Sequence, residues 1–307
     1  MLTMGGYIKR LPTDTFRAQG RGGKGVMGLS TKEEDQVLKM FTTNTHSEIL
    51  FFTNRGRVFR LKAYDVPEGS RTSKGQAIVN FLQLAPGEKV TAILPKDDIE
   101  GAKFLVMATG AGTIKKTNIK SFDNVRRSGL IALKIHENDE LIWVKPSVGD
   151  DNISIVTERG QSIRFSEKDV REMGRNAAGV RGIKLKKNDK VIGMDIINPK
   201  LADKGEFELF TITENGLGKC TNLQEYKVQK RGGSGIRTAK VTEKTGKVVG
   251  AYISSKDDDS DLVLISMKGI VIRTAFKSVP TSGRDTQGVR LMRFKETGDH
   301  VSSVTFV

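Results

Sequence analysis

Short apolar segments recur along the whole chain and are separated by polar turns, many of which contain glycine. Residues 152–156 are one such segment, which leads into a turn and is followed at once by a second strand-like run. In residues 180–185 apolar and basic residues alternate, which predicts a strand with one buried and one charged face. The one helical signal lies at residues 166–173, where Ser166 is placed to cap a single turn. The pattern therefore predicts an all-β chain.

A pair of glycines recurs six times and sets the register of these strands. The first member, here called the turn glycine, lies in a tight hairpin that commonly requires a positive φ angle. The second glycine follows 19 residues later in five copies and 17 residues later in the third. Successive turn glycines are 48 to 56 residues apart, which is the period of a propeller blade. The six pairs are Gly6 and Gly25, Gly56 and Gly75, Gly112 and Gly129, Gly160 and Gly179, Gly216 and Gly235, and Gly269 and Gly288.

These repeats predict one domain, a six-bladed propeller-like disc with four strands per blade and about 24 strands in all. Radial repetition leaves few free strand edges, which protects an all-β chain from edge-to-edge pairing. The linkers between repeats are short and polar, so we expect a single ring over residues 1–307. The first repeat begins in the middle of a unit, and we therefore expect a domain of a longer polypeptide. The approximate repeat boundaries are 1–47, 48–101, 102–150, 151–203, 204–258 and 259–307.

Charge and composition narrow the choice of partner. The 307 residues carry a formal net charge of +15, and lysine and arginine are spread over all six repeats. A basic surface distributed around a ring favours a long polyanion, and the alternative is a soluble basic protein without such a partner. No segment approaches the roughly 18 consecutive apolar residues that span a bilayer, so no membrane partner is expected. The single cysteine, Cys220, and the lack of a secretory signal favour the cytoplasm.

A basic residue stands four positions after the turn glycine in five of the six repeats. In a ring, one such residue per blade makes an evenly spaced circle of positive charge, which suits a polyanion. The alternative for any single residue is a solvated strand end that its charge protects from pairing. For the whole set we favour electrostatic binding. The five residues are Arg10, Arg60, Lys116, Arg164 and Arg273, and Cys220 takes this place in the fifth repeat.

A second basic position lies in the loop four residues before the second glycine. It holds Arg21, Arg71, Arg175, Arg231 and Arg284, while the shorter third repeat has Arg126 and Arg127 in this loop. Lys24 and Lys74 add charge directly before the glycine. A glycine-rich loop lets main-chain amides approach a phosphate closely, although the geometry of the turn alone also explains its glycines. In the first repeat this loop reads Gln19, Gly20, Arg21, Gly22, Gly23, Lys24 and Gly25.

The sequence offers no constellation for catalysis or for a cofactor. His46, His136 and His300 are far apart and lack the pattern of a metal site, so we expect structural roles for them. The acidic run at residues 257–259 lacks the glycine and the distal glutamate of a calcium loop, and we interpret it as a solvated loop. Only 6% of the residues are aromatic, which argues against stacking on single-stranded bases. We therefore expect a domain without catalytic activity, metal or cofactor of its own.

The glycine-rich loop of the first repeat resembles a family signature. Residues 19–25 are similar to the seven-residue box Gln-Arg-Arg-Gly-Gly-Lys-Gly of the C-terminal domain of the DNA gyrase A protein. Gly20 departs from this box, and the fifth repeat has a second copy at residues 229–235, in which Ser234 replaces the lysine. The six repeats extend the resemblance over the whole chain.

The resemblance implies a β-pinwheel, a six-bladed disc whose neighbouring blades exchange a strand and whose basic rim wraps double-stranded DNA. It implies a part of an ATP-dependent type IIA topoisomerase, in which wrapping supports negative supercoiling while DNA cleavage and ATP hydrolysis reside elsewhere. The implied partners are the phosphates of duplex DNA, the N-terminal part of the gyrase A protein, and the gyrase B protein in an A₂B₂ complex, in the cytoplasm at the nucleoid. Two alternatives stay open: the corresponding domain of topoisomerase IV, which selects DNA segments, and a propeller scaffold for protein partners.

Overall fold

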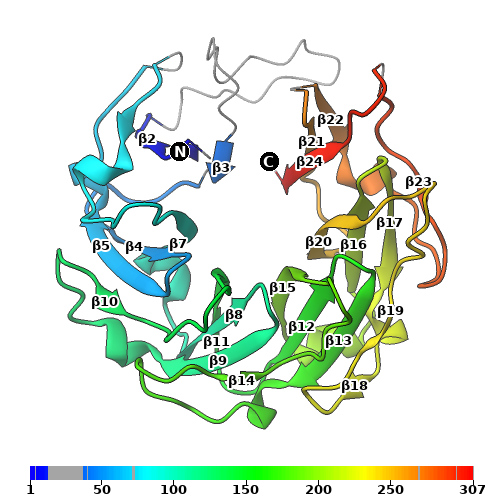
Figure 1. The fold of residues 1–307 in the computed structure, drawn as a ribbon, viewed down its shortest axis with the longest axis horizontal. Coiled ribbons are helices and arrows are strands. Elements are labelled where there is room, and N and C mark those ends of the chain that lie inside the picture. The colour runs from blue at the N-terminus through cyan, green and yellow to red at the C-terminus, as the bar shows by residue number, and fades with distance from the viewer. Residues whose placement is uncertain are drawn as a thin grey trace.

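The strands of the chain form six small sheets that stand around a ring (Figure 1). The two ends of the chain lie on the same side of this ring (Figure 1). The prediction of an all-β, six-bladed propeller is confirmed. The computed structural model describes residues 1–3, 5–12, 41–70, 73–268, 270–294 and 296–306. It also describes the backbone of residues 37–39.

Each sheet is built from short strands. The first sheet contains β3 (Val37–Lys39), β1 (Leu2–Thr3), β2 (Tyr7–Ile8) and β6 (Gln76–Ala77). The second contains β10 (Leu130–Ile131), β5 (Arg57–Lys62), β4 (Glu48–Thr53) and β7 (Val90–Pro95). The third contains β11 (Leu141–Ser147), β8 (Phe104–Thr109), β9 (Thr113–Asn118) and β14 (Val180–Arg181).

The remaining sheets follow the same order. The fourth contains β15 (Val191–Ile197), β12 (Asn152–Thr157), β13 (Gln161–Ser166) and β18 (Val228–Gln229), and β19 (Ile236–Arg237) also pairs with β13. The fifth contains β20 (Val248–Ser255), β16 (Phe207–Thr213), β17 (Leu217–Asn222) and β23 (Val289–Arg290). Among the described residues, the sixth contains β22 (Val271–Ala275), β21 (Asp261–Ser266) and β24 (Val301–Phe306).

Neighbouring repeats exchange one strand. β14 follows the second glycine of the fourth repeat, yet it pairs with β9 of the third repeat, where Val180 lies opposite Ile114. The same exchange joins β6 to β2, β10 to β5, β19 to β13 and β23 to β17. The last strands of the repeats contact one another on the inner side of the ring, whereas the exchanged strands lie on its outer side (Figure 1). The strand exchange that the resemblance implies is therefore confirmed.

The exchanged strands are shorter than the sequence pattern indicates. Alternation predicts a strand over residues 180–185, but β14 ends at Arg181. The main-chain amides of Gly182 and Ile183 leave the ladder and donate to the oxygen of Gly112, over 2.8 and 3.4 Å. Ile183 is still buried and Lys184 is exposed, which produces the alternation without a continuing strand.

The backbone explains both glycine positions. The turn glycine Gly56 has a φ angle of +72°, and the second glycine Gly235 has one of +71°. A Cβ atom on Gly56 would lie 2.2 Å from the main-chain oxygen of Leu133, and one on Gly235 would lie 2.5 Å from that of Ser162. Gly56 and Gly235 thus combine a left-handed backbone with the close approach of a neighbouring repeat.

The helical turn expected near Ser166 is present. The Ser166 side chain accepts a hydrogen bond from the amide of Lys168 and caps the 3₁₀ helix η6 (Glu167–Asp169). An equivalent turn follows the second strand of other repeats, which the sequence did not indicate. These turns are η2 (Ala63–Asp65), η5 (Ile119–Phe122), η7 (Leu223–Glu225) and η8 (Phe276–Ser278).

Among the described residues, three further short helices lie in connections between strands. They are η3 (Ile78–Asn80), η4 (Lys96–Ile99) and α1 (Pro199–Asp203), and α1 replaces what the sequence suggested was a polar linker. The side chain of Asn198 caps α1, and Pro199 begins it. None of the helices in the described ranges is long and apolar enough to cross a membrane.

The hydrophobic core lies between the blades. One buried cluster joins Leu50 and Phe52 of the second sheet to Leu105 and Met107 of the third. Similar clusters join the third sheet to the fourth and the fifth to the sixth. Each blade is therefore stabilised by its neighbours, and the outer strands with their loops are held at fixed places around the ring.

Candidate nucleic-acid interface

The basic residue four positions after the turn glycine joins one repeat to the next. In four repeats its side chain donates to a main-chain oxygen at or beside the 3₁₀ turn of the following repeat. The bonds run from Arg10 to Val66 over 2.9 Å, from Arg60 to Asp123 over 3.2 Å, from Lys116 to Glu167 over 2.9 Å and from Arg164 to Leu223 over 3.3 Å. This position therefore has a structural role that its sequence spacing did not reveal.

Burial corrects the expectation of an evenly exposed circle of charge at this position. Lys116 is 6% exposed and Arg164 is 4% exposed, so both side chains face the protein and not a passing polyanion. The reason is that the 3₁₀ turn of the next repeat places main-chain oxygens where solvent was expected. Burial also lowers the pKa of the Arg164 guanidinium.

The other three members of this set are accessible to solvent and form ion pairs. Arg10 pairs with Glu68 at 3.0 Å, Arg60 pairs with Glu48 at 3.3 Å, and Arg273 pairs with Asp261 at 2.6 Å. Exposed pairs of this kind contribute little to stability, so a competing phosphate could take the place of a carboxylate. A DNA contact by these three residues stays a prediction.

The loop arginines before the second glycine hold the outer strands in place. Arg231 donates through Nε to the main-chain oxygen of Asp169 and through Nη1 to that of Arg181, each over 2.9 Å. Arg284 donates through Nη1 to the main-chain oxygen of Arg237 over 3.2 Å. Each of these half-buried arginines thus fixes the exchanged strand that its neighbouring repeat contributes.

The remaining predicted loop residues differ in exposure. Arg126 is exposed, and Arg175 is half-buried. Lys74 is exposed, and its Nζ atom lies 4.1 Å from the centre of the Tyr7 ring, a cation–π distance. Outside the described residues lie Gln19, Gly20, Arg21, Gly22, Gly23, Lys24, Gly25 and Arg71, and their roles stay predictions.

The second box-like loop, at residues 229–235, is described. Its Gly232 amide donates to the oxygen of Gly182 over 2.6 Å, and its Gly233 oxygen accepts from the amide of Lys184 over 2.8 Å. Gly232 has a φ angle of +81°, which explains one of its glycines. The loop is therefore fastened by its main chain to the segment that follows an outer strand.

Sequence reasoning missed a set of exposed arginines on the outer strands, here called the rim arginines. Arg181 on β14, Arg237 on β19 and Arg290 on β23 each stand two residues after a second glycine, and all three are exposed. Three residues further along, a second exposed set continues the charge: Lys134, Lys184, Lys240 and Arg293. The alternation of apolar and basic residues could have indicated that these side chains are exposed. Their place on the outer side of the ring follows from strand exchange (Figure 1).

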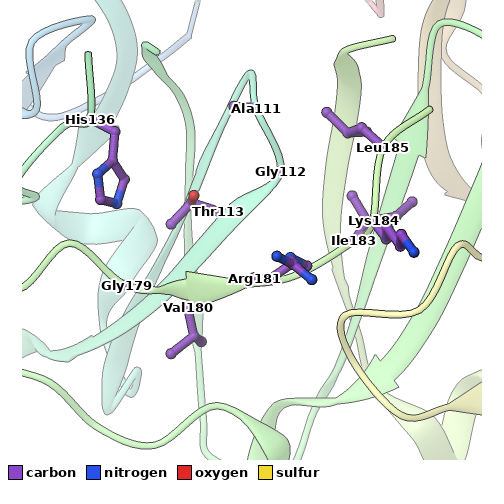
Figure 2. Close-up of a pocket in the computed structure, with 10 residues that line it drawn as sticks. All are labelled: Ala111, Gly112, Thr113, His136, Gly179, Val180, Arg181, Ile183, Lys184 and Leu185. Atoms are coloured by element: carbon purple, nitrogen blue, oxygen red, sulfur yellow. The ribbon is translucent and has the colours of Figure 1, made fainter. Parts of the chain in front are cut away.

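A cavity of about 400 Å³ opens between the third and fourth repeats, beside one rim arginine. Figure 2 shows the imidazole of His136 on one side of this cavity and the side chains of Arg181 and Lys184 toward the other. Its charged or titratable lining is basic, so the cavity suits an anionic group rather than a cation. Within the described ranges no three histidine, cysteine or acidic side chains gather as a metal site would require.

This geometry defines the class of the protein. It is a strand-exchanged, six-bladed β-propeller with arginines at one place on successive outer strands. A family model described as the DNA gyrase C-terminal domain, beta-propeller, matches six segments of the chain: 1–44, 47–95, 103–147, 151–198, 208–255 and 260–307. The chain belongs to this family, the C-terminal domains of DNA gyrase A proteins.

Relatives in sequence and in structure agree with this assignment. The chain is 41% identical to the DNA gyrase A protein of Staphylococcus epidermidis over 307 residues, which is 100% of the chain and 34% of that protein. It is 43% identical to the DNA gyrase A protein of Staphylococcus aureus over 293 residues, which is 95% of the chain and 32% of that protein. The chain thus spans about a third of the length of these curated relatives.

Two solved structures have the same fold. A DNA gyrase A C-terminal domain superposes with a TM-score of 0.78 at 26% identity, over 100% of this chain and 98% of the other. The C-terminal domain of a DNA topoisomerase IV superposes with a TM-score of 0.81 at 24% identity, over 100% of this chain and 91% of the other, and at that identity it supports the fold alone. The family model and the sequence relatives favour gyrase over the topoisomerase IV alternative.

Proposed function

We propose that this domain binds duplex DNA along its outer strands and wraps it, without catalysis of its own, and so supports negative supercoiling by a DNA gyrase. The observation that carries the proposal is the repetition of Arg181, Arg237 and Arg290 at one place on three successive exchanged strands. Because the blades stand around a ring, phosphates that meet these arginines in succession follow a curved path.

The energetics require several such contacts. Bending a site of 20 to 30 base pairs smoothly costs roughly 1–6 kcal/mol, and neutralised phosphates must offset that cost. About one or two phosphates per blade give roughly 6–10 contacts, and affinity then falls by roughly 10³–10⁵ between 50 and 200 mM salt. Binding of this kind reads the phosphate backbone, so it has little sequence preference.

The family supplies the wider setting of the proposal. We propose that the domain acts as part of a gyrase A protein, together with the N-terminal part of that protein and with the gyrase B protein in an A₂B₂ complex, in the cytoplasm at the nucleoid. DNA cleavage and ATP hydrolysis then occur in those other parts. The wrap presents one DNA segment to the enzyme core with a fixed crossing sign, which biases strand passage.

A plasmid relaxation experiment tests the proposal. A closed circular plasmid is relaxed by a nicking-closing enzyme with and without the domain, the protein is removed, and the linking number is read on a gel. We expect a positive shift in linking number that grows with domain concentration. Binding without a shift would indicate bending alone and favour a role like that of topoisomerase IV, and no binding would favour a scaffold for protein partners.

A further inference from the structure

The position three residues after the turn glycine alternates between lysine and an apolar residue around the ring. It holds Lys9, Phe59, Lys115, Ile163, Lys219 and Ile272 in the six repeats. The three lysines belong to the first, third and fifth repeats, and they are only 2%, 0% and 1% exposed. Lysine is almost never fully buried unless its ammonium group is satisfied, so these three residues require an explanation.

Each buried ammonium group holds main-chain oxygens of the loop before the second glycine in the next repeat. Lys219 Nζ donates to the oxygens of Gly283 and Arg284 over 2.7 and 2.6 Å, and to the Thr286 hydroxyl over 3.2 Å. Lys9 Nζ donates to the oxygens of Ser70 and Ser73 over 3.1 and 2.7 Å.

The third-repeat lysine makes the same connection and adds a second one. Lys115 Nζ donates to the oxygen of Arg175 in the fourth-repeat loop over 2.5 Å. It also donates to the oxygen of Ala132 over 2.8 Å, in the segment that follows the exchanged strand β10. Charge-assisted bonds to main-chain oxygens fix the backbone of a loop while leaving its side chains free.

The loops held in this way carry the half-buried loop arginines Arg175 and Arg284. Arg284 contributes its main-chain oxygen to Lys219, and its guanidinium donates to the oxygen of the rim residue Arg237. A continuous set of contacts therefore runs from a buried lysine to an exposed arginine on an outer strand. In the third and fourth repeats, Lys115 holds the oxygen of Arg175 in the same way.

The alternation between lysine and an apolar residue shows that the blade fold does not itself require lysine at this position. The second and fourth repeats have buried Phe59 and Ile163 at the same position, and their blades form the same sheets. An apolar side chain is therefore compatible with a blade at this place. What the lysine adds is the fastening of the next loop.

We propose that Lys115 and Lys219 are positioning residues that lock the arginine loops of the fourth and sixth repeats, and thereby hold the rim in register for wrapped duplex. This proposal rests on the proposed function. Lys9 has the same geometry toward the second-repeat loop and acts in the same way. The lysines do not touch DNA, because their ammonium groups are buried.

The test is the double variant Lys115→Ile and Lys219→Ile, which places the residue of the fourth and sixth repeats at both positions. Backbone hydrogen exchange is measured at residues 174–178 and 283–287, together with duplex binding and the plasmid linking-number shift. We expect the domain to fold, exchange in both loops to become about ten-fold faster, and the linking-number shift to decrease. The single variant Lys219→Met keeps the side-chain length and gives the same readouts at one loop if the double variant does not fold.

A matched control is the double variant Lys200→Ile and Lys256→Ile, which removes the same charge from two exposed side chains, one on α1 and one in the connection after β20. It should leave loop exchange unchanged and reduce the linking-number shift less. Unchanged exchange in both loops of the lysine variants would overturn the proposal. If the unmodified domain binds no duplex, the proposed function fails while loop exchange still reports the fastening itself, so the two failures are distinguishable.

Discussion

The guanidinium of Arg164 lies across the boundary between the fourth and fifth repeats and donates to the main-chain oxygens of Leu223 and Tyr226, over 3.3 and 3.5 Å. These two oxygens belong to η7 and the residue that ends it. A basic residue whose spacing suggests a DNA contact thus donates hydrogen bonds to main-chain oxygens at a turn of the next blade.

Replacement of Arg164 should therefore damage stability more than DNA binding. In Arg164→Leu the Tyr226 oxygen loses the guanidinium donor, while the Leu223 oxygen keeps the amide of Tyr226 over 3.0 Å, and we expect the free energy of unfolding to fall by about 1–3 kcal/mol. Urea denaturation measures this loss. The salt dependence of DNA binding should be the same in Arg164→Leu as in the unmodified domain. The control is Arg181→Leu, an exposed position where stability should change little. A weakened salt dependence in Arg164→Leu with full stability would contradict the structural role.

The rim arginines should account for a distinct part of the salt dependence. In the triple variant Arg181→Gln, Arg237→Gln and Arg290→Gln, we expect the slope of log affinity against log salt to decrease by roughly 3, about one per lost phosphate contact. Fluorescence titration of a duplex at several salt concentrations measures this slope.

A control of equal charge separates rim contacts from net charge. The triple variant Lys200→Gln, Lys204→Gln and Lys256→Gln removes three exposed charges, two of them at α1 and one in the connection after β20. Its slope should change less. Equal slopes for the two triple variants would mean that the place of the charges on the outer strands does not matter.

Two glycines in one loop should respond differently to alanine. Gly179 has a φ angle of +92°, and a Cβ atom there would lie 2.7 Å from the oxygen of Ile114, whereas nothing lies within 4 Å of one on Gly174. Gly179→Ala should lower the free energy of unfolding by more than about 1 kcal/mol, because strain and a close contact add. Gly174→Ala should be nearly neutral. Thermal denaturation of both variants tests the difference, and equal losses would contradict it.

The six blades could be predicted from the sequence because the backbone geometry of each turn restricts a single position to glycine. A hairpin turn with positive φ and a close neighbour admits only glycine, so Gly56 and its equivalents leave a regular signature in the sequence. Strand exchange was implied by the family resemblance alone. The 3₁₀ turn after Ser166 was predicted from its serine cap, but the equivalent turns η2, η5, η7 and η8 were missed because three or four residues carry too little pattern to detect.

The orientation of basic side chains was not predictable. Lys115 is buried because oxygens 17 and 60 residues away surround its ammonium group, and no local pattern encodes that arrangement. Arg181 belongs to an alternating segment, but its place on the outer side follows from pairing with the preceding repeat. The exposure of these basic side chains depends on contacts between repeats, and the spacing of residues within one repeat carries no information about those contacts.

A buried carboxyl group should weaken the domain at neutral pH. Glu167 is fully buried, neither of its carboxylate oxygens has a hydrogen-bond partner among the described residues, and burial raises its pKa above 4.5. The Ser147 side chain and the charge of Lys116 partly offset this effect on the pKa, and the charge of Asp151 adds to it. We expect Glu167→Gln to raise the free energy of unfolding at pH 7 by about 1 kcal/mol.

The sign of the pH effect follows from the raised pKa of Glu167. Above 4.5 and up to its raised pKa, the folded state binds more protons than the unfolded state, so this group adds stability as the pH falls. The advantage of Glu167→Gln over the unmodified domain should therefore shrink as the pH is lowered toward 4.5. Denaturation curves of both proteins over this range test the trend, and a constant difference would contradict it.

The buried lysines should give the opposite dependence at high pH. Burial lowers the pKa of Lys115 and of Lys219 from 10.5 to about 8. Arg175 faces Lys115 and lowers its pKa further, while Glu225 and Asp285 raise that of Lys219 and Arg284 lowers it. Between about pH 8 and pH 10.5 the unfolded state binds more protons than the folded state. The free energy of unfolding therefore rises with pH by at most about 1.4 kcal/mol per pH unit for each lysine.

Comparison with the lysine variants isolates this contribution from other titrating groups. From pH 8 to pH 10, the unmodified domain should gain stability relative to the double variant Lys115→Ile and Lys219→Ile, because only the former releases protons from these buried groups. Below pH 7 the difference between the two proteins should be constant. Parallel stability curves over the alkaline range would show that the ammonium groups are not buried in solution as they are in the structure.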